Sequence, residues 1–358
     1  MRRGIANLPL HGGKAPRWLF RRMVLLSKAI LEAMLEEFPP EEFLRRISHP
    51  GWFQSLGCVI GFDWHSSGLT TTTVGALKEA LREISSPLLM VAGGKGKAAL
   101  RTPEEVNSLA EKYGFEPSPI VQASRLSAKV DSALLQDGYS LYHHAIFFTS
   151  GGKWAVVQQG MREDVGLARR YHWLSEGLVD FIEEPHSGIS SQRKESLVLD
   201  LTSRLSGQNR EVMVELAKQN PEKTEREIRR LIVLDLPRRH ALLARDMSPA
   251  HLKRAMASTY QRAPSDVKEL LEIRGVGAKF LRALSLVADL IYGASPSFND
   301  PALYSFAHGG KDGTPYPVDR AVYDRTIEIL EKAIKKARLG EKERLQALRR
   351  LSSEFPGA

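Results

Sequence analysis

The 358-residue sequence contains a single cysteine, Cys58. One thiol excludes a disulfide framework, a zinc site built from two or more thiolates, and a four-cysteine iron–sulfur cluster. The sequence also lacks an uncharged run of 18 apolar residues, and no continuous apolar segment follows its first nine residues. We therefore expect a protein of the reducing cytoplasm that is neither secreted nor embedded in a membrane.

The composition is that of an ordinary globular protein, with 42% hydrophobic and 26% charged residues. These values exclude wholesale disorder and a fibrous repeat, and the length predicts about two domains. Lys and Arg number 51 against 42 Asp and Glu, so the formal charge is +9. Residues 1–200 carry 23 basic and 22 acidic side chains, whereas residues 201–358 carry 28 and 20. The surplus predicts a polyanionic partner, such as nucleic acid, on the C-terminal half.

Periodicity predicts helices in most of the N-terminal half. Residues 16–38 repeat apolar side chains every three or four positions, and Pro40 followed by two glutamates starts a second helix that runs to about residue 48. Residues 70–84 should also be helical. The short apolar runs at residues 58–62 and 87–92 are bounded by Gly or Pro, which favours buried strands.

Aromatic and β-branched residues at 140–161 surround Gly151 and Gly152 and predict a β-hairpin. The polar, turn-rich segment 184–192 suggests a domain boundary, and everything after it has a helical pattern. We therefore expect an α+β protein. Residues 1–190 should form a mixed α/β domain with short strands, whose role the sequence leaves open, and residues 191–358 an all-helical domain.

Residues 265–291 predict two helices joined by a Gly-Val-Gly turn. Ser265 or Asp266 can cap the first helix, and the glycines permit a tight turn. The alternative is an ordinary turn between two core helices. This stretch resembles the helix-hairpin-helix motif, which grips a nucleic-acid backbone through N–H groups at a helix start. The expected DNA-binding residues are Arg274, Gly275, Val276, Gly277, Arg282 and Arg320.

A second match lies beyond a loop at residues 293–315, where Pro317-Val318-Asp319 opens a predicted helix. Together with Gly275-Val276-Gly277-Ala278-Lys279, this segment resembles the helix-hairpin-helix superfamily of DNA glycosylases. The sequence departs from that family in having Arg274 before the first glycine, Arg320-Ala321 after the aspartate, and a longer intervening loop. No cysteine cluster follows, which excludes an iron–sulfur version.

The resemblance implies a DNA glycosylase with AP-lyase activity in base excision repair. Its substrate would be double-stranded DNA with a modified, mispaired or abasic nucleotide, whose base is flipped into a pocket, and it would need no cofactor. Asp319 would stabilise positive charge on the sugar, and the neutral amine of Lys279 would attack C1′. From the residues alone, Asp319 can equally be a helix cap and Lys279 a phosphate contact.

The long loop supplies candidates for the pocket of a flipped base, because polar and aromatic side chains gather in it. These residues are Phe298, Asn299, Tyr304, His308 and Lys311. Four Gly-Gly-Lys triplets also occur, and none has the spacing of a P-loop. The one at residues 93–95 can equally be a phosphate contact or a turn.

Two other classes of function stay open, a metal-dependent DNA nuclease and a non-enzymatic DNA-binding protein. Imidazole and carboxylate ligands for Zn, Mn or Fe are available in the N-terminal half, although no pair has a diagnostic spacing. Adjacent histidines on a strand face opposite sides and cannot easily share one metal, so no metal site is assigned. The candidate ligands are Asp63, His65, His143, His144, Glu183, Glu184 and His186.

The chain as a whole resembles an archaeal and bacterial family known as domain of unknown function 763. The resemblance is carried by Leu-His-Gly-Gly-Lys-Ala-Pro-Arg-Trp-Leu at residues 10–19, Phe-Asp-Trp-His-Ser-Ser-Gly at 62–68 and Phe-Ala-His-Gly-Gly-Lys-Asp-Gly at 306–313. This resemblance identifies relatives of the chain, but it predicts no reaction, substrate or ligand.

Overall fold

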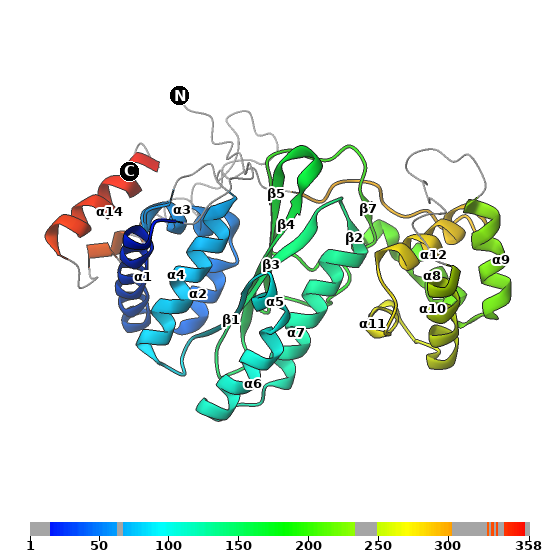
Figure 1. The fold of residues 1–358 in the computed structure, drawn as a ribbon, viewed down its shortest axis with the longest axis horizontal. Coiled ribbons are helices and arrows are strands. Elements are labelled where there is room, and N and C mark those ends of the chain that lie inside the picture. Colours follow the sequence, from blue (N-terminus) through cyan, green and yellow to red (C-terminus); the bar gives the residue numbers. More distant parts are fainter. Residues whose placement is uncertain are drawn as a thin grey trace.

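The structure is a computed structural model, shown in Figure 1. It describes residues 15–62, 67–232 and 249–302, together with 328, 331–332, 334–335 and 340–354. The elements follow one another along one long axis. Helices from the N-terminal part of the chain occupy one end, an antiparallel sheet the middle, and later helices the other end (Figure 1). No helix in the described ranges is long and apolar enough to cross a membrane.

Four helices precede the sheet, and three of them confirm predictions. They are α1 (Arg17–Glu37), α2 (Pro40–Ile47), α3 (Pro50–Val59) and α4 (Gly68–Ile84). The periodic residues Met23, Ile30 and Met34 of α1 are buried, as the pattern predicts. Pro40 stands at the first position of α2, where its missing N–H costs no hydrogen bond, and the acidic residues of the first turn complement the positive end of the helix.

The strand predicted at residues 58–62 is wrong, because Cys58 and Val59 are the last two residues of α3. Every residue of this helix is buried, so its apolar side chains show no amphipathic period. A short apolar run of this kind does not distinguish a buried helix from a buried strand. The other predicted strand exists, shifted toward the C-terminus, as β1 (Met90–Lys95), and its Gly-Gly-Lys belongs to that strand.

The main sheet is antiparallel, in the order β1-β3-β4-β5-β6. Its further strands are β3 (Ser140–Phe148), β4 (Trp154–Arg162), β5 (Leu167–Leu174) and β6 (Gly188–Ser191). The predicted hairpin is confirmed as β3 and β4, with Gly152 in the left-handed region at its tip (φ +81°). The helices α5 (Lys97–Leu100), α6 (Thr102–Tyr113) and α7 (Ser118–Lys129) follow β1, and α7 continues into a π-helical turn, η1 (Val130–Leu134).

The two faces of the sheet bury different cores, since successive side chains on a strand point to opposite sides. Phe147 and Val157 pack with α1 to α4. Phe148 and Val156 pack on the other face, in a core that continues into the helices after residue 206. The sheet therefore joins the two ends of the molecule.

Short strands interrupt the region after residue 184, which was predicted to be a polar linker followed by helices alone. Residues 188–191 form β6, and β7 (Leu199–Asp200) pairs with β2 (Leu135–Gln136). This part of the prediction is wrong because both strands are too short and too polar to show a period of two. The division into two domains at residue 190 stays a prediction, although a continuous core spans it.

The later helices are α8 (Gly207–Lys218), α9 (Pro221–Ile232), α10 (Pro249–Arg262), α11 (Val267–Glu272), α12 (Ala278–Leu290) and α14 (Glu341–Glu354). Of these, α14 lies at the opposite end from α8 to α12, beside the N-terminal helices (Figure 1). Ala347 is fully buried in the core of those helices, and the Arg350 guanidinium donates to the Val59 carbonyl at 2.8 Å. The last helix therefore stabilises the N-terminal part of the fold.

Candidate functional site

The turn predicted between two helices lies between α11 and α12. Asp266 caps α11, as predicted, because its carboxylate accepts a hydrogen bond from the Glu269 N–H at 2.8 Å. Ile273 and Val276 are buried and anchor the turn to the helices. The backbone at Gly275 is in the left-handed region (φ +93°), so glycine is the residue that fits there without strain.

Space beside the two glycines is open. A methyl group added to Gly275 or Gly277 would meet no described heavy atom within 4 Å, and Gly277 has an extended backbone that any residue adopts. The glycine at 277 is therefore not required by crowding within the described chain. From the adjacent α10, the His251 imidazole Nε2 lies 3.1 Å from the Gly275 carbonyl oxygen and fixes the turn. The result is an ordered backbone that an external group can approach closely.

The predicted DNA-binding cations differ in their surroundings. Arg274 and Lys279 are exposed, on either side of the turn. Arg282 is half-buried, and its Nε donates to the Gln136 side-chain oxygen at 2.7 Å. The Gln136 amide donates in turn to the Ala278 carbonyl at 2.8 Å, so β2 is fastened to the first turns of α12. Arg282 thus has a structural partner within the chain.

Several predicted site residues lie outside the described residues. They are Asp319, Arg320, Tyr304, His308 and Lys311 of the proposed catalytic and pocket regions, and Asp63 and His65 of the metal candidates. Of the predicted pocket, Asn299 lines a cavity of about 470 Å³, whereas Phe298 lines a small hollow with Arg282.

The described metal candidates do not converge, and the described ranges contain no group of three His, Cys, Asp or Glu side chains placed to hold a metal. His143 and His144 are both buried on β3 and point to opposite faces, as predicted. His144 hydrogen-bonds the Ser124 hydroxyl and the Gln158 side chain, each at 2.8 Å. Glu183 pairs with Arg204 and Arg210 instead.

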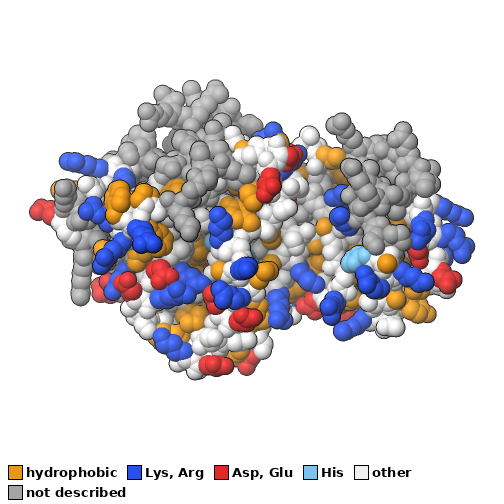
Figure 2. Space-filling view, viewed as in Figure 1, with side chains coloured by type: hydrophobic (Ala, Val, Ile, Leu, Met, Phe, Trp, Pro, Cys, Tyr) orange, Lys and Arg blue, Asp and Glu red, His pale blue; other side chains and the backbone are white. Residues whose placement is uncertain are grey.

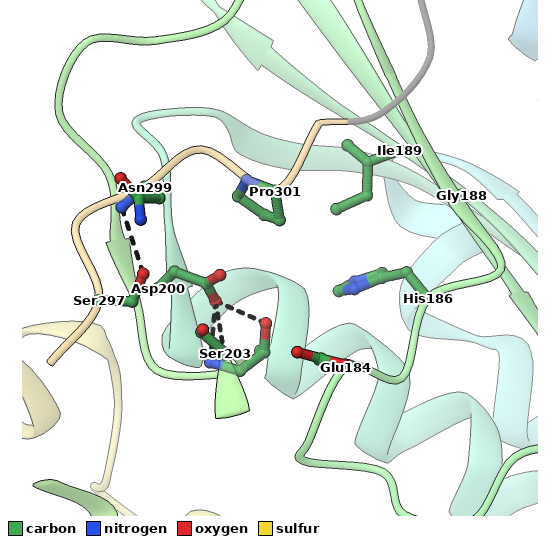
Figure 3. A pocket seen from close by; sticks show the side chains of 10 residues that line it. Glu184, His186, Gly188, Ile189, Asp200, Ser203, Ser297, Asn299 and Pro301 are labelled. Atoms are coloured by element: carbon green, nitrogen blue, oxygen red, sulfur yellow. Dashed lines mark hydrogen bonds between the residues drawn. The ribbon is translucent and has the colours of Figure 1, made fainter. Parts of the chain in front are cut away.

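A cavity of about 470 Å³ lies between β6, β7 and the segment before residue 302. In Figure 3, Glu184, His186, Asp200 and Asn299 surround its space, and Ile189 and Pro301 form apolar walls. Gly188, Thr202, Ser203 and Ser297 complete the described lining. Among these ten lining residues there are two carboxylates and no Lys or Arg.

His186 forms one wall of the cavity and is held by the buried carboxylate of Asp131. The His186 Nε2 lies 2.5 Å from the Asp131 Oδ1, and both side chains are largely shielded from solvent. Asp131 Oδ2 accepts from the Gln158 amide at 2.5 Å and the Trp173 indole N–H at 2.9 Å. In the tautomer that donates its Nε2–H to this carboxylate, Nδ1 is the acceptor nitrogen of the ring. This is the geometry of an oriented general base.

Backbone irregularities accompany the pair. Asp131 stands in the π-helical turn η1, an uncommon conformation that is frequent at functional sites. On the cavity wall, Glu184 adopts a left-handed conformation (φ +45°) just before Pro185. A non-glycine residue in this region costs about 1–3 kcal/mol, and such strain clusters at sites of function.

Asp200 presents a second carboxylate to the cavity. Its Oδ1 accepts the Thr202 N–H at 2.9 Å, the Thr202 hydroxyl at 2.6 Å and the Ser203 N–H at 3.2 Å. Within the described part of the chain Oδ2 accepts no hydrogen bond. Burial raises the pKa of Asp200, and the hydrogen bonds from Thr202 oppose this shift.

The segment that carries Asn299 and Pro301 is tied to the sheet by a buried ion-pair network. Arg169 donates to both oxygens of Asp300, at 3.0 and 2.7 Å, and to Asp137 at 3.0 Å. All three side chains are almost fully buried. The bidentate pair fixes this wall of the cavity relative to β5.

Sequence reasoning missed Asp131 and Asp200 altogether. The partners of Asp131 are 27, 42 and 55 residues away, at Gln158, Trp173 and His186, so no local spacing links them. Its one local signal is an acidic residue just after the amphipathic pattern of α7. His186 and Glu184 are predicted as metal candidates, and Asn299 is predicted as a pocket residue.

The described chain is an α+β protein, with helices on both faces of an antiparallel sheet and a carboxylate-lined cavity beside its last strand. Residues 4–318 match the family described as protein of unknown function (DUF763). The chain belongs to this family. Comparison with curated proteins and with solved structures gives no match.

Proposed function

We propose that this protein binds double-stranded DNA through the turn between α11 and α12, and that it excises a base from the bound duplex. The exposed glycine turn carries the first part of the proposal. Arg274 and Lys279 flank an open backbone there, at the N-terminal end of α12. Helix N-termini and nearby cations hold phosphate oxygens without reading base sequence.

The distribution of charge supports the same surface. Residues 201–302, which include the turn and α8 to α12, carry 17 basic and 12 acidic side chains, a surplus of five positive charges. Figure 2 shows Lys and Arg side chains over the end of the molecule that contains α8 to α12, as well as over the N-terminal helices. A polyanion that meets this end gains both the backbone contacts of the turn and the electrostatic attraction of the surrounding cations.

The proposed chemistry uses Lys279 as the nucleophile. Its neutral amine attacks C1′ of an extrahelical nucleotide, the C1′–N bond breaks, and the electron pair leaves with the base, which takes up a proton. Loss of the amine proton and opening of the sugar ring give a Schiff base. Removal of a C2′ proton then expels the 3′ phosphate by β-elimination. Asp319 is the proposed carboxylate that stabilises positive charge on the sugar.

The binding step is tested with Arg274→Gln. Fluorescence anisotropy on a short labelled duplex, measured over a series of salt concentrations, should show weaker binding by the variant. The slope of log K against log [salt] should fall by about 1, since one phosphate contact is lost. Lys28→Gln in α1, at the other end of the molecule, is the charge-matched control. Absence of salt-dependent binding by the wild type, or an equal loss in both variants, refutes the proposal.

The excision step is tested by borohydride trapping on duplexes with an abasic site or a single damaged base. Wild-type protein should give a covalent adduct, and Lys279→Gln should give none while it still binds DNA. An adduct that persists in Lys279→Gln rules out this nucleophile. DNA binding without any product identifies a non-enzymatic binding protein, and a product abolished by a chelator identifies a metal-dependent nuclease.

A further inference from the structure

The cavity beside His186 has a chemistry that the proposed reaction does not use. We infer that it binds a single nucleobase that carries an exocyclic amino group, such as cytosine, adenine, guanine or a modified form of one of these. This inference rests on the proposed function for the source of the base, which would be the DNA held at the turn. It deepens that function by naming the substrate class.

Size and shape are the first argument. A volume of about 470 Å³ lies within the range of small-molecule sites, roughly 300–1,000 Å³. Such a cavity accommodates one base with part of its sugar and excludes a duplex. Ile189 and Pro301 lie beside one another along one side of the space in Figure 3 and provide apolar surface, which suits the flat face of a heterocycle.

The charge of the lining is the second argument. Asp200 and Glu184 present carboxylates, the latter 3.7 Å from the Arg204 guanidinium, and no Lys or Arg stands among the ten described lining residues. The Asp200 carboxylate would repel a phosphate group placed there. A carboxylate oxygen such as Asp200 Oδ2 accepts a hydrogen bond from an amino group, as Asp and Glu do from cytosine N4. Thymine and uracil have a carbonyl oxygen where cytosine has its amino group, and this oxygen would face the same carboxylate. We therefore expect thymine and uracil to bind more weakly.

His186 supplies a further acceptor. Since its Nε2 is bonded to Asp131, Nδ1 remains on the ring that projects into the cavity in Figure 3. Nδ1 can accept a ring N–H or amino proton of the base. Trp173, whose ring centre lies 4.8 Å from that of His186 at an angle of 62°, holds the imidazole in place. The site is thus built from acceptors whose orientations are fixed before a ligand arrives.

The cavity and the DNA-binding turn share one structural segment. Asp131 lies in η1, and the chain continues through β2 to Gln136, which bonds both Ala278 and Arg282 of α12. β2 also pairs with β7, which carries Asp200. DNA held at the turn therefore rests on the same connected elements that form the cavity.

The test uses free deoxynucleosides with the full chain, so that it is independent of DNA binding. Saturation-transfer NMR should show binding of deoxycytidine or deoxyadenosine in preference to thymidine. Asp200→Asn keeps the size of the side chain and the Oδ1 acceptor, and should weaken binding of the amino-bearing nucleoside by about tenfold. Asp164→Asn, at an exposed carboxylate on the β4–β5 turn, is the matched control.

A second variant distinguishes loss of the ligand contact from loss of the folded structure. Glu184→Gln alters a carboxylate at the exposed rim and should lower the preference over thymidine without unfolding the chain. Equal binding of thymidine, unchanged binding in both variants, or no signal from any deoxynucleoside overturns the inference, whether or not DNA binds at the turn. Selective binding of amino-bearing nucleosides by a protein that does not bind duplex DNA refutes the proposed function and leaves the cavity assignment standing, with free nucleosides as its source.

Discussion

His143 is a buried histidine for which neither ring nitrogen has a hydrogen-bond partner among the described residues. Burial lowers its pKa to about 3, with a smaller contribution from neighbouring cations and His144. The side chain is therefore neutral in the folded protein at pH 7. A buried polar group without partners costs stability, whereas an apolar replacement of similar size is close to neutral or stabilising.

His143→Leu should make the stability less sensitive to acid. Because the folded pKa lies below the unfolded value of about 6.5, the unfolded chain binds the proton first, and stability falls as the pH drops from about 6.5 toward 3. Between pH 7 and 5 the wild type should lose about 2 kcal/mol more unfolding free energy than the variant. Urea unfolding at the two pH values measures this difference.

The control for this prediction is Phe147→Leu, at a fully buried position on the same face of β3. It removes core volume without changing a titratable group, so it should lower stability equally at both pH values. An acid sensitivity of His143→Leu equal to that of the wild type would contradict the assignment of a depressed pKa.

At the scale of elements, the segment around Asp300 is the part of the cavity wall that depends on a distant strand. Its carboxylate accepts two hydrogen bonds from Arg169 of β5 and one from the Glu195 N–H at 2.6 Å. Removing one partner of a buried ion pair leaves the other charge poorly compensated.

Asp300→Asn should lower the free energy of unfolding by about 3 kcal/mol, the lower end for a broken buried pair, since Asp137 still neutralises part of the Arg169 charge. Hydrogen exchange at the Glu195 and Ala302 amides, both bonded to Asp300, should accelerate locally. Asp164→Asn breaks an exposed pair with Arg162 and should leave the free energy of unfolding almost unchanged, because solvent screens that pair. Equal losses of unfolding free energy in the two variants would argue against a role of Asp300 in holding this segment against β5.

The elements differ in how far the sequence predicts them, and the difference is physical. α1 and the β3–β4 hairpin have strong periods and local turn signals, so they are predictable. α3 is buried on every side and β6 is four residues long, so neither shows a period. The Asp266 cap and the Gly275 turn depend on neighbouring residues and are predictable from the sequence. Asp131 and His186 are 55 residues apart, and only the folded chain brings them together, so no sequence spacing predicts the pair.

At the scale of the whole molecule, α14 belongs with the N-terminal helices rather than with α8 to α12. Ala347→Asp would place an unpaired charge in a fully buried position, and should lower the free energy of unfolding by at least about 2 kcal/mol in urea unfolding. Gln346→Asp, at the exposed neighbouring position, has a similar effect on helix propensity and should cost less than about 1 kcal/mol. Equal effects would mean that α14 does not contribute to that core.

The burial of Cys58 makes it possible to label the turn between α11 and α12 selectively. It is the one thiol of the chain and is buried at the end of α3, so thiol-reactive probes should modify it slowly. A cysteine introduced at Gly277, where the backbone is extended and the space open, would therefore take up a fluorophore or nitroxide almost exclusively. The same molecule would then report, by quenching or line broadening, how closely a DNA backbone approaches the turn.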